Sequence, residues 1–236
     1  MRLTLCQWSI LHLLLEHPLL SDEELSAFLR LQRKSARCSL YDLHQLGCLE
    51  PIATVVGKRS HLCESGLRLL AAANHMHIRN ISAISDNEAE SETSTVVQRG
   101  EAWLLQRIKH TAGIYDFFAS LAQAAKREPG QALCWWETRV VCERRYLVGE
   151  QWYNLKPDAL AEYHVGSQRM RFWLEWDHGS SHARDLAVDF TSYAHSIASR
   201  EWARERSMLP VLVCVAPDIA QASLTSPPRL VVWTTT

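Results

Sequence analysis

The segments Pro157–Tyr163 (PDALAEY) and Arg171–Asp177 (RFWLEWD) are short, apolar and aromatic, and a polar Gly-Ser-Gln turn lies between them. This pattern predicts a β-hairpin. Side chains two residues apart on a strand share a face, so we expect Asp158, Glu175 and Asp177 to meet at one end of the hairpin. Three carboxylates repel one another unless a cation or a proton joins them. A hard metal ion that prefers oxygen ligands, such as Mg²⁺, is one way to satisfy this need.

A purely structural interpretation of these acids stays open. In it, Asp158 caps a turn after Pro157, and Glu175 and Asp177 end a strand in solvent. The two tryptophans that flank Glu175 argue against it, because burying an unpaired carboxylate among aromatic rings is costly.

Composition limits the class of protein. The chain has 236 residues, enough for one large domain or two small ones, and 47% of them are hydrophobic. The formal net charge is −1, so any nucleic-acid partner must be held by local basic patches. Seven cysteines without a C-x-x-C motif, and no secretory signal, predict reduced thiols and a cytoplasmic protein. No segment reaches the roughly 18 apolar residues of a membrane span, so we expect no membrane partner.

The pattern of the first 76 residues predicts a DNA-binding module. Helical spacing of apolar residues predicts helices over 5–17, from Ser21 to about Leu29 behind a capping box, and over 33–47. A hairpin with a turn at Gly57-Lys58 and a short helix over 65–73 follow. Three helices followed by a two-stranded hairpin is the order of a winged helix-turn-helix domain.

Basic residues follow the geometry with which such a domain binds double-stranded DNA. The third helix inserts in the major groove and the hairpin contacts phosphates. The predicted DNA-binding residues are Arg30, Arg33, Lys34, Arg37, Lys58 and Arg59. The alternatives are an ordinary solvated surface and a winged helix used for protein contacts.

Residues 77–99 are expected to form an acidic flexible linker, because residues 82–95 include four acids, no base and few large apolar side chains. Residues 100–236 predict a second domain of the α/β class (α+β for the whole chain). Its expected order is a long helix over 100–128, a strand over 132–137, the central hairpin, a helix over 180–206 and strands over 209–216 and 229–233. Residues 138–156 are expected to be irregular or a loose hairpin. This order is a mixed sheet with a helix on each side.

The order and the acids of this second domain resemble the restriction-endonuclease-like core of the PD-(D/E)xK nucleases. Pro157-Asp158 and Glu175-Trp176-Asp177 match the motif in part, and Glu137 matches an earlier acid that often joins the site. The resemblance implies that Glu137, Asp158, Glu175 and Asp177 are the catalytic residues.

Most of the chain also resembles a narrower group, the replication-relaxation family of plasmid and mobile-element proteins. Its most specific piece is Leu174–Gly179 followed by a helix that carries Tyr193. The other matching pieces are 40–49, 62–70, His110, Trp136-Glu137, Lys156-Pro157-Asp158 and 172–173. This resemblance implies a winged helix joined to a nuclease-like domain, in a DNA-binding protein of replication or relaxation.

One departure bears on catalysis. Asp177 stands where the nuclease motif has a lysine that stabilises developing charge. Asp189 stands where the family usually has a lysine before the helix tyrosine, and Arg184 and Lys156 are the nearest basic alternatives. We therefore expect the nuclease-like domain to be inactive or only weakly active.

Two other functions stay open. The first is a Mg²⁺-dependent DNA endonuclease or nickase that uses Asp158 and Glu175. The second is a winged-helix transcription regulator whose C-terminal domain serves dimerisation or ligand binding. Protein partners of a replication or mobilisation complex and a homodimer are the expected protein contacts. The chain stops soon after Trp233, which leaves a longer natural protein or a further terminal helix open.

Overall fold

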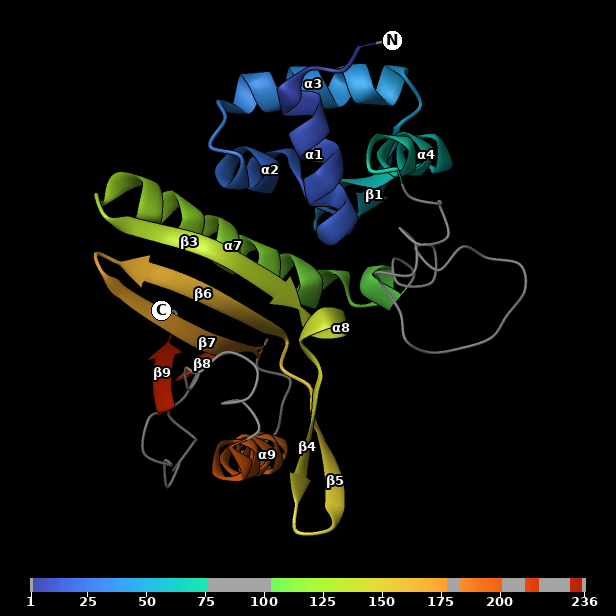
Figure 1. Cartoon of the computed structure of the whole chain (residues 1–236). Coiled ribbons are helices and arrows are strands. Elements are labelled where there is room, and N and C mark those ends of the chain that lie inside the picture. The colour runs from blue at the N-terminus through green and yellow to red at the C-terminus, as the bar shows by residue number, and fades with distance from the viewer. Residues whose placement is uncertain (1, 76–102, 178–182, 201–210, 217–229, 235–236) are drawn as a thin grey trace, which may run out of the picture. The chain divides into compact units, whose positions relative to one another are not determined.

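The structure is a computed structural model that describes residues 2–75, 103–177, 183–200, 211–216 and 230–234 (Figure 1). The predicted linker 77–99 lies outside the described residues. The chain divides into two compact units, Met1–Arg127 and Glu128–Thr236. Within the described residues, no helix combines the length and the apolar character needed to cross a lipid bilayer.

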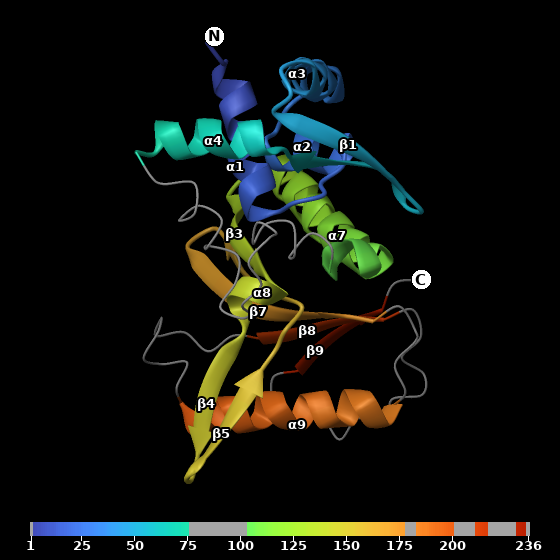
Figure 2. The same ribbon diagram turned by 90° about the vertical axis from the view of Figure 1, so that its right-hand side faces the viewer.

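The N-terminal unit is mostly helical. Its elements are α1 (Leu5–Glu16), α2 (Asp22–Phe28), α3 (Arg33–Gln45), β1 (Leu49–Thr54), β2 (Gly57–Leu62), α4 (Glu64–Ala73) and α7 (Ile108–Arg127) (Figures 1 and 2). The predicted capping box of α2 is confirmed: Ser21 and Glu24 each accept a hydrogen bond from the other's backbone N–H. Three helices, a hairpin and a further helix therefore follow in the predicted order.

Apolar spacing explains how α3 packs. Ala36, Leu40 and Leu43 recur at helical intervals and are buried, whereas the opposite face of the helix is polar. After α3, β1 and β2 pair antiparallel through a two-residue loop, Val55-Val56. Gly57 follows that loop with φ +106°, a backbone conformation that glycine adopts without the steric cost of a side chain.

The helix α7 is part of the N-terminal unit. It packs against α2, and the hydroxyl of the buried Tyr115 donates a hydrogen bond of 2.9 Å to the carbonyl oxygen of Pro18. The prediction grouped this helix with the second domain. Its sequence gave no sign of this packing, because an apolar stripe does not name the surface that it covers.

The C-terminal unit is built on a five-stranded sheet with strand order β3-β6-β7-β8-β9. Its elements are β3 (Gln131–Thr138), α8 (Arg139–Cys142), β4 (Arg144–Val148), β5 (Gln151–Leu155), β6 (Ala159–Val165), β7 (Gln168–Trp176), α9 (Ala183–Ser199), β8 (Val211–Ala216) and β9 (Leu230–Thr234). The strands β3, β6 and β7 pair antiparallel, and β8 and β9 join β7 in parallel. The predicted central hairpin and the mixed helix-and-sheet class are confirmed.

One face of this sheet packs against α9. Leu160, Trp173 and Leu212 stand side by side on neighbouring strands and form a core with Tyr193 of α9. The separate hairpin β4–β5 adds Tyr146 and other buried side chains to the same core and lies beside α9 (Figure 2). We call this the α9 face of the sheet.

Candidate nucleic-acid interface and carboxylate site

The exposed side of α3 carries a cluster of cations. Arg33, Lys34 and Arg37 are all exposed, with side-chain exposures of 57% for Arg33 and 68% for Arg37. They line a shallow concavity together with Cys38, Tyr41 and Asp42. These six residues are spaced so that they fall on one side of the helix, and we call them the α3 basic face.

Acids of α2 partly neutralise this face. Asp22 Oδ2 lies 3.4 Å from Arg33 Nε and 3.6 Å from Arg37 Nε, and Glu23 pairs with Arg33. Ion pairs this exposed contribute little to stability, so a phosphate group can compete for the same guanidinium groups. Arg30, between α2 and α3, and Lys58, beside the hairpin loop, are also exposed.

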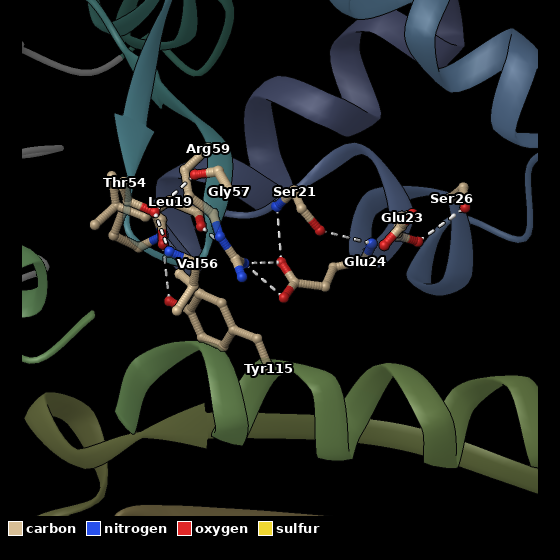
Figure 3. A network of polar contacts seen from close by, with 11 residues as sticks. Leu19, Ser21, Glu23, Glu24, Ser26, Thr54, Val56, Gly57, Arg59 and Tyr115 are labelled. Atoms are coloured by element: carbon tan, nitrogen blue, oxygen red, sulfur yellow. Dashed lines mark hydrogen bonds and ion pairs between the residues drawn. The ribbon is translucent and has the colours of Figure 1, made fainter. Parts of the chain in front are cut away.

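The structure corrects the prediction for Arg59. This side chain is only 4% exposed, and its Nη1 lies 2.6 Å and 2.5 Å from the two carboxylate oxygens of Glu24, which is 1% exposed (Figure 3). The same atom approaches the carbonyl oxygen of Leu19 at 3.4 Å. Arg59 therefore joins β2 to α2 inside the fold and is not placed to contact DNA. Its neighbour Lys58, whose side chain leaves the strand on the opposite side, stays in solvent.

In the C-terminal unit, three of the predicted acids share the α9 face. Cross-strand partners lie on the same face, and Glu137 pairs with Leu160, which in turn pairs with Trp173. Glu175 is two residues after Trp173 on β7, so its side chain points to that face as well. Asp158 directly precedes β6, and its charge acts on Tyr193 of α9, which places it near the same face. The β6–β7 register ends with Ala159 opposite Leu174, which puts Asp158 and Glu175 at the same end of the hairpin.

The carboxylate of Glu175 is held by α9. The hydroxyl of Tyr193 donates a hydrogen bond to Glu175 Oε1, and the Tyr193 ring lies 5.2 Å from the ring of Trp173. Burial and then the charge of Glu175 raise the pKa of Tyr193 well above its ordinary value. Tyr193 is therefore a neutral donor at neutral pH. The sequence singled out Tyr193 only as part of a resemblance.

The carboxylate of Asp158 is buried and accepts a hydrogen bond from the backbone. Asp158 is 6% exposed, and its Oδ2 accepts a 2.9 Å hydrogen bond from the N–H of Trp176. The N–H of Asp158 donates to the carbonyl oxygen of Leu174 at 3.0 Å. Asp158 thus joins the start of β6 to the end of β7.

Arg144 is the basic side chain found next to these acids. Its Nη2 lies 3.7 Å from Glu137 Oε2. The sequence did not predict that Arg144 lies beside Glu137, because 138–156 were expected to be irregular or a loose hairpin. Lys156 instead lies 3.2 Å from Glu143. The side chains of Arg184 and Asp189 lie outside the described part of the structure.

The acids do not form a compact metal cluster. Among the described residues, no three of Glu137, Asp158, Glu175 and Asp177 bring ligand oxygens within 4.8 Å of one another. The N–H of Asp177 donates to the carbonyl oxygen of Val215 at 2.8 Å, so this residue extends the sheet ladder past β7. In the described part of the chain, the site thus consists of the hydrogen-bonded carboxylates of Asp158 and Glu175 and the Glu137–Arg144 ion pair.

Comparison with known proteins identifies the family. The family model described as replication-relaxation matches residues 11–212, which is most of the chain and reaches into both compact units. Searches among curated proteins and among solved structures found no match. The chain belongs to the replication-relaxation family.

Proposed function

We propose that this protein binds double-stranded DNA in the replication or relaxation of a plasmid or mobile element, and that the α3 basic face is its DNA-reading surface. The observation that carries the proposal is the position of three exposed cations on one side of α3, beside an exposed Tyr41 and a shallow concavity. A helix of this width and charge fits the major groove of B-form DNA.

The element order supports treating residues 1–76 as a winged helix-turn-helix domain. In that arrangement β1–β2 is the wing, and Lys58 is its exposed cation. Arg30 and Lys58 flank the α3 basic face in the role of phosphate contacts. Phosphate contacts supply affinity and its salt dependence, whereas side chains in the groove supply specificity.

We propose that the C-terminal unit is a nuclease-like domain that is inactive or weakly active. Hydrogen bonds already engage both motif acids, Glu175 through Tyr193 and Asp158 through the backbone of Trp176. An acid, Asp177, occupies the position of the motif lysine. These features favour a DNA-holding or structural role for the carboxylates.

A Mg²⁺-dependent endonuclease or nickase is the second candidate. It is favoured by the shared face of Glu137, Asp158 and Glu175 and by Arg144 at 3.7 Å from Glu137. In that function Asp158 and Glu175 bind the ion, and Arg144 supplies the positive charge that the lysine supplies elsewhere.

Duplex binding across a range of salt concentrations tests the main proposal. The doubly substituted protein Arg33→Ala/Arg37→Ala should bind duplex DNA more weakly, and its plot of log affinity against log salt should flatten, because the variant brings two fewer positive charges to the duplex. The matched control is Arg68→Ala, an exposed arginine of α4 paired with Glu64. Equal affinity and slope for both proteins would exclude the α3 basic face as the DNA-binding surface.

A further inference from the structure

A second cluster of ligand-type side chains lies on the α9 face, away from the carboxylate site. Cys134 of β3 and Glu162 and His164 of β6 have their Sγ, carboxylate oxygen and ring nitrogen all within 4.8 Å of one another. Glu162 and His164 are four and six residues beyond Asp158, which directly precedes β6, and this separation corresponds to roughly 13–20 Å along an extended chain. The cluster is therefore separate from the acids described above.

A β-bulge creates this cluster. Leu133 pairs with Tyr163 and Trp135 pairs with Glu162, so Cys134 is an extra residue without a cross-strand partner. Without the bulge, strict alternation would place Cys134 and Trp135 on opposite faces. A bulge re-aims a side chain, and here it brings the thiol to the face that Glu162 and His164 share.

We propose that Cys134, Glu162 and His164 form a binding site for a divalent transition-metal ion of the Zn²⁺ type. A thiolate, an imidazole and a carboxylate are the three ligand types that zinc takes in proteins, at about 2.0–2.3 Å. In a tetrahedral site their donor atoms stand about 3.3–3.7 Å apart, so the observed cluster needs only small side-chain rotations. Three protein ligands leave the fourth position to water or another ligand.

A neighbouring side chain orients the carboxylate of Glu162, as is common for carboxylates that bind metals. Its Oε2 accepts a 2.8 Å hydrogen bond from Arg171 Nε, and the Arg171 guanidinium stacks over the Trp135 ring at 5.8 Å. Such outer partners orient a ligating carboxylate. Glu162 Oε1 faces His164 Nε2 at 2.9 Å, and the ion takes the place of this contact.

Two nearby positive charges, those of Arg171 and Arg169, oppose the binding of a cation. Arg169 Nη1 lies 3.9 Å from Glu162 Oε1, and this arginine is 57% exposed. Its positive charge lowers the affinity for a cation, so removing it should strengthen metal binding. If Glu162 were only the centre of an ion-pair cluster, no metal would bind, and removing Arg169 would have no effect on metal affinity.

Titration of the metal-free full chain with Co²⁺ and then Zn²⁺ tests the site. We expect one equivalent of Co²⁺ to bind with a thiolate-to-cobalt charge-transfer absorption, and Zn²⁺ to displace it. Cys134→Ser should abolish that absorption, His164→Gln should weaken affinity at least about tenfold, and Arg169→Ala should strengthen it. The matched control is Cys38→Ser, which removes an exposed cysteine in the other unit.

Two results would overturn the proposal. One is the absence of charge-transfer absorption in the folded wild-type chain. The other is an absorption that Cys134→Ser retains or that Cys38→Ser removes. Circular dichroism of each variant shows whether it is folded. Cys134 is exposed, so its replacement by serine is expected to leave the fold intact.

Discussion

The hydroxyl group of Tyr193 donates a hydrogen bond to Oε1 of Glu175, and this contact joins α9 to the end of β7. Tyr193→Phe should lower the free energy of unfolding by about 1.5–3 kcal/mol, because a hydrogen bond to a charged, partly buried group is lost. Urea denaturation measures the change. Tyr153→Phe is the control, since its hydroxyl bonds the exposed Gln151. Equal effects for the two variants would show that the contact with Glu175 adds nothing.

The buried pair of Arg59 and Glu24 should behave as a unit. Burial raises the pKa of Glu24 above its ordinary value, and the charge of Arg59 opposes that shift. Arg59→Met alone or Glu24→Leu alone should each destabilise the protein by about 3–5 kcal/mol, because each leaves one buried charge without its partner. The double variant should lose much less than the sum. Additive losses in urea denaturation would contradict a coupled pair.

His17 should make stability depend on pH. Burial lowers the pKa of His17 to about 3 from an ordinary value of 6.5, so the folded protein holds it neutral while the unfolded chain binds a proton below pH 6.5. Its contribution is therefore complete above pH 6.5 and is lost as the pH falls toward 3.

Comparison with His17→Leu isolates this effect from that of the carboxylic acids, including Glu24, whose pKa is raised by burial. Between pH 7 and pH 5 the wild-type chain should lose about 2 kcal/mol more unfolding free energy than His17→Leu. If the free energy of unfolding of the two proteins depended on pH in the same way, the folded protein would bind the His17 proton as readily as the unfolded chain does.

Removing the acids that pair with the α3 basic face should strengthen DNA binding. Asp22→Asn/Glu23→Gln frees Arg33 and Arg37 from their ion pairs, so duplex affinity should rise several-fold at low salt and the gain should shrink as salt screens the charges. Fluorescence anisotropy with a labelled duplex measures this. Glu64→Gln on α4, which removes one acid paired with Arg68, controls for net charge. An equal gain in the control would point to a general charge effect.

Metal-dependent nicking of supercoiled plasmid separates the two candidate functions of the C-terminal unit. We expect little or no nicking with Mg²⁺ or Mn²⁺. If nicking does occur, Asp158→Asn and Arg144→Ala should each abolish it, whereas Glu64→Gln on α4 should not. Activity that survives Asp158→Asn would mean that the carboxylate site is not its source.

Local patterns predicted much of this fold. The capping box at Ser21 and Glu24 and the apolar stripe of α3 each depend on residues within a few positions of one another. The paired segments of β6 and β7 are also neighbours in sequence, so their register follows from one turn. For the same reason, the placement of Asp158 and Glu175 at the same end of the hairpin was predictable.

Contacts between distant residues were not predictable. In the sequence, Lys58 and Arg59 are both expected to be exposed cations of the wing. In the structure, Arg59 forms a buried ion pair with Glu24, which is 35 residues away in the chain, whereas Lys58 stays exposed. The bulge at Cys134 is likewise invisible without its partner strand. By itself the sequence determined the local elements and the family, because these depend on short spacings. Only the tertiary structure decided which charges are free, which acids are hydrogen-bonded and which thiol lies beside a histidine, because burial and pairing depend on segments that folding brings together.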